Sequence, residues 1–348
     1  MDKGEIIEAE VMPVNKNDRN GLTTFNPTNQ RDYFNMFVAF IDATPNTLRT
    51  YKTSLKQWFK FTQEHNIQQP KPEDVKLYRK ELQDAGKRAT TVQNYIMAVK
   101  QFFKWTEEAG IYRDIAKHVK GVRISTEHKK DYLTSKQARK ILLAIDRTSV
   151  KGERDYAMLV LMLTMGLRTV EVSRSNIEDM RASGDTTVLY VQGKGHDEKD
   201  APVRMPEHVE NAIREYLKAR GNISPKEPLF TSTSHNNAGQ RLTTRSISGT
   251  VKSCFKQAGF NSDRLTAHST RHTAATLNLL NGGTLEETQQ LLRHANLQTT
   301  EIYAHHLTAI KNKSSNRVDN AILVRICKHT NVIILAYTNV GTDKGMKF

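Results

Sequence analysis

The sequence has few cysteines, the residues that cross-link small proteins through disulfides or metal ions. Its 348 residues include only two cysteines, Cys254 and Cys327, and no CxxC pair. A disulfide framework needs an even, closely spaced set of cysteines, and the common zinc sites need paired ones. Both are therefore excluded. The two cysteines are interpreted as small apolar side chains in the core.

Long apolar runs are also missing. No segment approaches the roughly 18 consecutive apolar residues of a membrane span. The opening residues MDKGEIIEAE lack the apolar core of a signal peptide, and the chain contains no internal repeats or low-complexity tracts. We therefore expect a cytoplasmic protein that has no membrane partner.

Acidic residues are outnumbered by basic ones. Lys and Arg number 52 against 37 Asp and Glu, so the formal net charge is +15. An excess of this size predicts a polyanionic partner, either nucleic acid or an anionic membrane surface. The length adds a second expectation, because domains of roughly 100–200 residues would divide this chain into two.

Periodicity and composition divide the chain further. The first half has the pattern of four or five short helices, and the second half has helices around two or three strands at a GKG turn. The predicted fold class is mainly α with a small antiparallel β-sheet (α+β). We expect a flexible N-terminal arm at 1–29, a helical domain at 30–115, a basic linker at 116–131, a larger domain at 132–312 and a C-terminal tail at 313–348.

Several helix ends are marked by their residue types. Asn46 or Thr47 is expected to cap the helix that contains TLRTYKTSLKQWFKF, and Thr134 or Ser135 the helix that contains SKQARKILL. The segment DYAMLVLMLTMG is almost entirely apolar, which predicts a buried helix that ends at Gly166.

Basic residues cluster on two of the expected helices in the domain at 30–115. A single Lys or Arg normally just faces solvent, so the prediction depends on their number and grouping. Cationic side chains and helix N-termini both bind phosphate, and we expect these helices to hold duplex DNA by its backbone. The candidates are Arg49, Lys52, Lys56, Lys60, Lys87, Arg88, Thr90, Thr91, Asn94 and Lys100.

Two arginines of the larger domain are candidates for a phosphate site. Arg168 directly follows the buried helix, and Arg271 lies in LTAHSTRHTAATL. Guanidinium groups bind phosphate bidentately and stay charged at working pH. Two that converge would neutralise the transition state of phosphoryl transfer. Glu171, about one helical turn after Arg168, is a candidate to orient Arg168 or a nearby histidine.

Histidines accompany the second arginine. His268 precedes Arg271 by three residues and shares its helix face, whereas His268 and His272 are four apart, a spacing that also suits metal chelation. No acidic residue completes an HExxH-type site, and Arg271 would place positive charge beside an ion. We therefore expect no metal and no cofactor.

A tyrosine completes the set. The segment LLRHANLQTTEIYAHHL brings His294 and then Tyr303. A phenol has a pKa near 10, so it attacks only beside a base or in a cationic setting. The histidines and arginines supply both, and we predict that Tyr303 is a nucleophile. A phosphotyrosyl ester would conserve the energy of the cut bond, so that rejoining needs no ATP.

These pieces match a known family. The chain resembles the tyrosine site-specific recombinases of the phage-integrase and Xer type in TMGLRTVEV, VQGKGHDEKDAPVRMP, LTAHSTRHTAATL and LLRHANLQTTEIYAH, which occur in this order. The resemblance covers most of residues 30–315. It implies a core-type DNA-binding domain and a catalytic domain that form a C-shaped clamp on DNA. Family members often donate a C-terminal element to a neighbouring protomer, and here three alternatives stay open for the tail: exchange with a partner, docking on its own domain, or loose order.

The resemblance also implies a role for each site residue. Arg168 and Arg271 bind the scissile phosphate, and His268 assists proton transfer to or from the nucleophile. His294 hydrogen-bonds the phosphate in the transition state, and Tyr303 forms a 3′-phosphotyrosyl link.

The leaving group needs an acid of its own. The resemblance implies that Lys194, in the GKG turn, protonates the departing 5′-oxygen. Lys199 lies in the same hairpin and is the alternative. Glu171 is implied to support the catalytic side chains from behind.

The expected function is therefore site-specific recombination through a Holliday junction, without metal or ATP. The expected partners are double-stranded DNA that carries a recombination site and three further copies in a homotetramer on two such sites. Accessory DNA-bending proteins are further candidates, and nucleoid association is expected when DNA is bound. Two alternatives stay open: a non-catalytic DNA-binding regulator on the same fold, and a type-IB-like topoisomerase.

Overall fold

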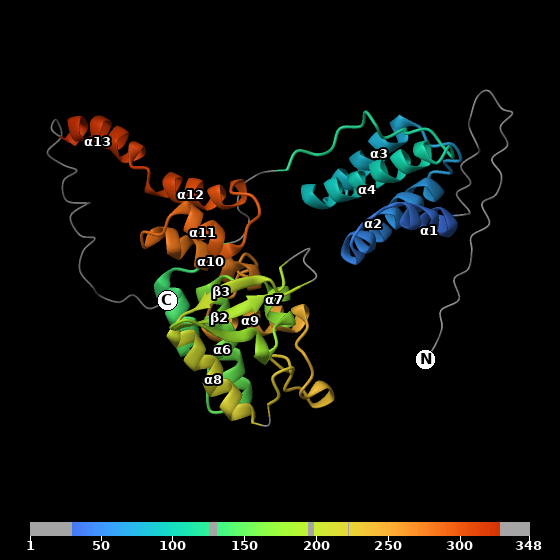
Figure 1. The fold of residues 1–348 in the computed structure, drawn as a ribbon. Coiled ribbons are helices and arrows are strands. Elements are labelled where there is room, and N and C mark those ends of the chain that lie inside the picture. The colour runs from blue at the N-terminus through green and yellow to red at the C-terminus, as the bar shows by residue number, and fades with distance from the viewer. Residues whose placement is uncertain (1–29, 125–130, 194–197, 222, 328–348) are drawn as a thin grey trace. The chain divides into compact units, whose positions relative to one another are not determined.

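The computed structural model describes residues 30–124, 131–193, 198–221 and 223–327. The chain divides after Glu127 into two compact units, which are drawn in Figure 1. Within the described residues, no helix is both long enough and apolar enough to cross a membrane.

The first unit is a helical domain with an aromatic core. Helices α1 (Gln30–Phe40), α2 (Pro45–Glu64), α3 (Pro72–Asp84) and α4 (Ala89–Glu108) follow one another, and α2 and α4 pack together. Trp58 of α2 meets Phe103 of α4 edge to face, with ring centroids 5.9 Å apart. Such large buried rings supply most of the apolar area that a small domain needs.

The beginning of α2 differs from the prediction. Thr44, not Asn46 or Thr47, is the N-cap, and its hydroxyl accepts a hydrogen bond from the Thr47 amide. Pro45 explains the shift, because proline suits the first helical position and has no amide hydrogen to lose. At α5 (Ser135–Leu143) the cap is Thr134, one of the two residues predicted there.

The chain after α4 packs back onto the first unit. Ile115, Ala116 and Val119 are buried in its core, and the Lys100 ammonium donates a hydrogen bond to the Val119 carbonyl. No helix or strand forms between this point and residue 124.

The second unit is built around α6 (Val150–Met165). This helix is buried along most of its length, and it packs against α8 (Glu207–Arg220), α9 (Thr244–Gln257) and α10 (Ala267–Leu280). From Ala157 to Met165 all of its side chains except Thr164 are apolar, so this part of the helix has no broad face that prefers water. It ends at Gly166 in the left-handed conformation (φ 61°), as expected for a glycine after a helix.

A three-stranded sheet lies beside these helices. Strands β1 (Met180–Ser183), β2 (Thr186–Val191) and β3 (Ala201–Met205) are antiparallel in the order β1-β2-β3, with Leu189 paired to Val203. The predicted fold class, mainly α with a small antiparallel sheet, is confirmed.

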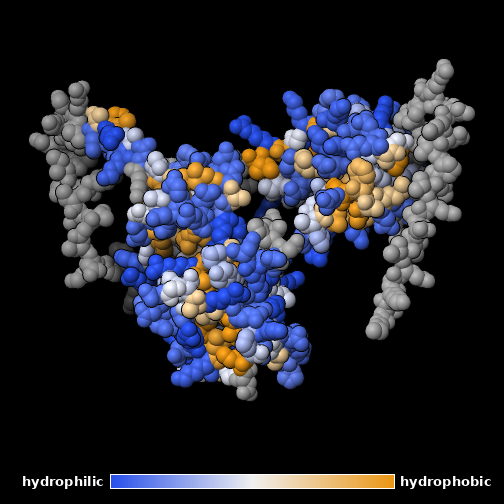
Figure 2. Space-filling view, viewed as in Figure 1, coloured by the Kyte–Doolittle hydropathy of each residue, from blue (hydrophilic) through white to orange (hydrophobic). Residues whose placement is uncertain are grey.

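Shorter elements complete the unit. Helices α11 (Leu285–Leu292) and α12 (Gln298–Lys311) pack against α10 and each other. The last helix, α13 (Ser314–Cys327), exposes Val318 and Ile322, and Figure 2 shows apolar side chains on its surface. The remaining elements are α7 (Thr169–Arg174), η2 (Ile177–Asp179) and η3 (His235–Asn237).

Gly166 allows a test of this packing. A Cβ added there would lie 2.9 Å from the Leu292 side chain, whereas one at Gly184 (φ 59°) would meet nothing within 4 Å. Both Gly→Ala changes carry the left-handed strain of about 1–2 kcal/mol. We expect Gly166→Ala to cost about 1–3 kcal/mol more, because it also overpacks the core. Urea unfolding of the second unit measures both losses, and equal losses would contradict the packing argument.

Candidate active site

Arg168 begins α7, immediately after the turn at Gly166. Its Nη1 donates to Oε1 of Glu171 at 2.8 Å, and its backbone amide donates to Oε2 of the same carboxylate at 2.7 Å. The arginine side chain is 27% exposed. It is therefore anchored on one side and still accessible to a ligand on the other.

Glu171 is a fully buried carboxylate that serves two arginines. Its Oε2 also accepts a hydrogen bond from Nη2 of Arg293 at 2.8 Å. Burial alone would raise the pKa of Glu171, but the Arg293 charge, the Arg168 amide and the Arg168 charge together lower it. Glu171 is therefore ionised, and its negative charge compensates part of the positive charge around it.

Arg271 is held by backbone carbonyls. It is 1% exposed on α10, and its Nη1 donates to the Gly166 carbonyl at 2.6 Å while Nη2 donates to the Leu292 carbonyl. Burial and the nearby Arg168 charge lower its pKa to about 9, so it stays cationic at neutral pH. One carbonyl ends α6 and the other ends α11, so Arg271 ties two distant stretches together.

His268 lies one helical turn before Arg271 and is exposed. Its ring meets that of buried His272 edge to face, with centroids 4.6 Å apart, and the His272 ring lies 5.3 Å from that of Tyr303. The pair that could have chelated a metal is thus part of a ring series that leads to the tyrosine.

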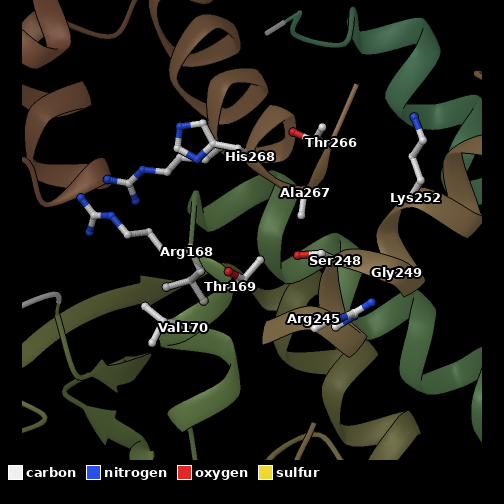
Figure 3. Close-up of a pocket in the computed structure, with 12 residues that line it drawn as sticks. Arg168, Thr169, Val170, Arg245, Ser248, Gly249, Lys252, Thr266, Ala267 and His268 are labelled. Carbon is white, nitrogen blue, oxygen red and sulfur yellow. The ribbon is translucent and has the colours of Figure 1, made fainter. Parts of the chain in front are cut away.

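Arg168, His268 and Arg271 line one pocket of about 660 Å³. Figure 3 shows Arg168 and His268 at one end of this pocket and Arg245 of α9 at the other. Arg245 is exposed. The positive lining therefore extends from the two arginines onto α9, a surface suited to a polyanion that is longer than a single phosphate.

His294 follows α11 and is fixed by α12. Its Nδ1 shares a hydrogen bond of 2.9 Å with the Thr300 hydroxyl. Burial, followed by the charges of Arg271 and Arg168, lowers its pKa to about 4. The imidazole is therefore neutral at pH 7.

Tyr303 lies on α12 and is 6% exposed. It packs in a small apolar cluster with Ala275 and Leu292. Burial raises its pKa to about 12, although Arg271 and Arg168 act in the opposite direction. The resting side chain is thus a protonated phenol that lies within the electrostatic reach of both arginines.

The structure brings together five of the six residues predicted to be catalytic: Arg168, His268, Arg271, His294 and Tyr303. The sixth, Lys194, lies outside the described residues. Its alternative, Lys199, forms an ion pair of 2.5 Å with the buried carboxylate of Asp179.

The residues predicted to bind DNA lie in the first unit. Two of them bind other polar groups, and the Lys52 ammonium lies 5.9 Å from the centroid of the Phe34 ring. Lys60 pairs with Glu64 at 3.4 Å, and Lys100 is used by the Val119 carbonyl. Thr91 is half-buried at the start of α4. The others are exposed, namely Arg49, Lys52, Lys56, Lys87, Arg88, Thr90 and Asn94.

Two residues of the site were not identified from the sequence. Arg293 contacts Glu171, and Thr300 contacts His294. Arg293 directly precedes a candidate histidine, but a lone arginine in a turn normally faces solvent. The sequence therefore carried no signal that separates it from a surface residue.

Two family models match the chain. The phage integrase family model matches residues 131–309, and the model of the phage integrase N-terminal SAM-like domain matches residues 33–110. These ranges lie in the second and first units, respectively.

Known proteins show the same likeness over most of the chain. It is 31% identical over 303 residues to tyrosine recombinase XerC of Thermodesulfovibrio yellowstonii, covering 82% of this chain and 97% of that protein. Its fold is similar to that of the XerH site-specific recombinase bound to a palindromic difH substrate (TM-score 0.65, 21% identity, 78% of this chain and 79% of that chain). It is also similar to a lambda integrase tetramer bound to a Holliday junction (TM-score 0.63, 14% identity, 81% and 78%).

The electrostatics of His294 can be measured directly. We expect Arg168→Gln to raise the pKa of His294 above about 4, because it removes a charge that disfavours the imidazolium. Arg245→Gln is the control, since Arg245 lines the pocket but is not among the charges that lower this pKa. NMR titration of the ring protons gives both values, and an unchanged value in Arg168→Gln would contradict this account.

The same shift has a consequence for stability. Between about pH 4 and the unfolded value near 6.5, the unfolded chain binds more protons at His294 than the folded chain. The contribution of His294 to stability is therefore complete above this window and is lost as the pH falls through it.

Proposed function

Because the chain belongs to the phage integrase family of tyrosine recombinases, we propose that Tyr303 is the nucleophile of its DNA breaking and rejoining reaction. The resemblance predicted from four motifs is thereby confirmed as a family, and site-specific recombination is its function. One observation carries the assignment of the site: Leu292 packs in one cluster with Tyr303, and its carbonyl accepts a hydrogen bond from Arg271. Arg271 also donates to the Gly166 carbonyl, two residues before Arg168.

In this reaction Arg168 and Arg271 hold the scissile phosphodiester. The Tyr303 oxygen attacks phosphorus, its proton passes toward His268, and the bond from phosphorus to the 5′-oxygen breaks. The guanidinium groups stabilise the negative charge that develops on the phosphoryl oxygens, and the neutral His294 donates a hydrogen bond to one of them. The 3′-phosphotyrosyl ester keeps the energy of the cut bond, so a 5′-hydroxyl can reverse the reaction without ATP.

Lys194 is the proposed acid for the 5′-oxygen. An alkoxide is a poor leaving group, so it needs a proton as the bond breaks. The alternative, Lys199, is engaged by Asp179 at 2.5 Å and is only 25% exposed. An ammonium held by a buried carboxylate is a poor donor to DNA, which favours Lys194.

The two units divide the work in this proposal. The second unit is the catalytic domain, and the first is a core-type DNA-binding domain whose exposed residues at Arg49, Lys52 and Lys56 contact the phosphate backbone. These three lie on one stripe of α2, at intervals of three and four residues. Arg88 and Thr90 add a second contact at the start of α4.

The proposed assembly is a homotetramer on two DNA sites. The XerH and lambda integrase structures hold a specific DNA site and a Holliday junction, respectively, and they support specific duplex DNA and a four-protomer junction complex for this chain. The exposed Val318 and Ile322 of α13 suit docking on a neighbouring protomer. Accessory DNA-bending proteins remain candidate partners.

A covalent-capture experiment tests the nucleophile. Protein incubated with fragmented genomic DNA is denatured and purified, and the DNA attached to it is sequenced to define the site. A nicked duplex with that site then traps the covalent complex, because the short fragment that carries the free 5′-hydroxyl diffuses away and cannot rejoin. We expect trapping by the wild type and none above background by Tyr303→Phe, since the phenylalanine has no attacking oxygen.

The matched control is Tyr156→Phe, which removes a hydroxyl on α6 beside Arg147, where neither residue lines the pocket. Binding of the duplex by Tyr303→Phe must persist. Covalent trapping by Tyr303→Phe would refute the assignment. Relaxation of a plasmid that lacks the site would favour the topoisomerase alternative.

A second experiment separates the two lysines. We expect Lys194→Ala to slow cleavage by about 10²–10⁴-fold, the usual contribution of a general acid, and Lys199→Ala to keep most of the rate. A duplex whose bridging 5′-oxygen is replaced by sulfur should restore Lys194→Ala, because a thiolate leaves without protonation. The opposite result would assign the acid to Lys199: Lys199→Ala would be restored only by the sulfur-substituted duplex, and Lys194→Ala would cleave ordinary DNA.

A further inference from the structure

Arg293 has a backbone conformation that its side chain disfavours. It follows α11 with φ 53° and ψ 48°, in the left-handed region. Among the described residues other than glycine, Asn66 alone shares a positive φ, and asparagine tolerates this region well. Strain of this kind persists where the surroundings enforce it, often at functional sites. The side chain of Arg293 is therefore expected to have a task that glycine could not perform.

That side chain reaches across the site. Its Nη2 donates to Oε2 of Glu171 at 2.8 Å and its Nη1 to the Leu291 carbonyl at 2.6 Å. It is 13% exposed, and Glu171 is 0% exposed. Arg293 thus links the end of α11 to the start of α7, 122 residues away in sequence.

The charges of this group explain what the link achieves. Glu171 carries one negative charge and contacts two guanidinium groups, those of Arg168 and Arg293. Without Arg293, Glu171 and Arg168 would form a pair with no net charge. With it, the group keeps one net positive charge, and that charge lies where Arg168 is exposed to the pocket.

The backbone of the same turn also contacts the other site residues. Leu292, just before Arg293, supplies the carbonyl that holds Arg271, and His294, just after it, bonds to Thr300 on the helix that carries Tyr303. The left-handed residue between them sets the directions of both groups.

We propose that Arg293 is a positioning residue for DNA cleavage, which shares the charge of Glu171 so that the group keeps a net positive charge toward the scissile phosphate. This inference rests on the proposed function. A purely structural clamp between α7 and α11 is the rival explanation, and the variants below distinguish the two.

Three substitutions separate strain, contact and charge. Arg293→Gly removes both the strain and the side chain, Arg293→Ala keeps the strain without the side chain, and Arg293→Lys keeps a charge near Glu171. We expect Gly and Ala to slow single-turnover cleavage of the nicked duplex by about 10–100-fold, as loss of a supporting contact usually does. Lys should recover most of the rate, and Gly should unfold at a higher temperature than Ala.

A double substitution tests the charge argument. Adding Glu171→Gln to Arg293→Gly removes the carboxylate that would otherwise neutralise Arg168. We expect the double variant to cleave faster than Arg293→Gly alone, whereas loss of a structural clamp would make it slower. Two results would overturn the proposal. One is cleavage by Arg293→Gly at the wild-type rate, and the other is a double variant that cleaves more slowly than Arg293→Gly at the same melting temperature.

A binding measurement keeps this inference separate from the proposed function. Inorganic phosphate is titrated into the wild type and Arg293→Gly, and the NMR signals of His294 report occupancy of the site. We expect weaker phosphate binding by the variant and restoration by Arg293→Lys. If the wild type binds phosphate this way but traps no DNA, the proposed function fails, and Arg293 keeps only its role in phosphate binding. Equal phosphate affinity in wild type and Arg293→Gly overturns the inference.

Discussion

The site depends on the ion pairs that the buried carboxylate of Glu171 forms with Arg168 and Arg293. Burial, followed by the nearby charges of Arg168 and Arg293, lowers the pKa of Arg271. Like charges at such distances repel strongly in a poorly solvated site. One fully buried negative charge, with the carbonyls of Gly166 and Leu292, compensates this repulsion. The cluster is thus stable enough to fold and still keeps excess positive charge for a phosphate.

The same field sets the resting state of the other groups. Positive charge and burial keep His294 neutral, and burial keeps Tyr303 protonated despite the arginines. A bound phosphodiester adds negative charge, which disfavours the phenolate of Tyr303 further. The tyrosine still needs a base when it attacks, and the rings of His272 and His268 form a continuous series away from it. The resting site therefore holds a neutral imidazole and a protonated phenol, and the phenol gives up its proton as it attacks.

The sequence predicted the parts of this arrangement that depend on local pattern. The buried helix, its end at Gly166, the small sheet and the residues at Arg168, Arg271, His294 and Tyr303 all followed from periodicity and residue type. Predictions failed or were missing where a neighbouring residue determines the local structure or the partner of a side chain. Pro45 moved the cap of α2 to Thr44.

Arg293 is the clearest example of a site residue that the sequence did not predict. Its left-handed backbone would ordinarily suggest glycine or asparagine, and its partner Glu171 lies 122 residues away. Only tertiary structure shows that the guanidinium is turned inward. Arg168 already lies near Glu171 in the sequence, so nothing in the sequence indicates that a second arginine also binds this carboxylate.

In the proposed division of work, affinity for DNA and chemistry are assigned to different units. The exposed cations of α2 and α4 contact solvent, so their attraction for DNA is screened by salt and grows with the number of counterions released. Arg271 and Glu171 are shielded from solvent, and their interaction changes little with ionic strength. Salt should therefore govern how much DNA is held, while the geometry at the scissile phosphate stays the same. An enzyme built in this way can bind many sequences weakly through its surface and still cleave only where the duplex places a phosphate against Arg168 and Arg271.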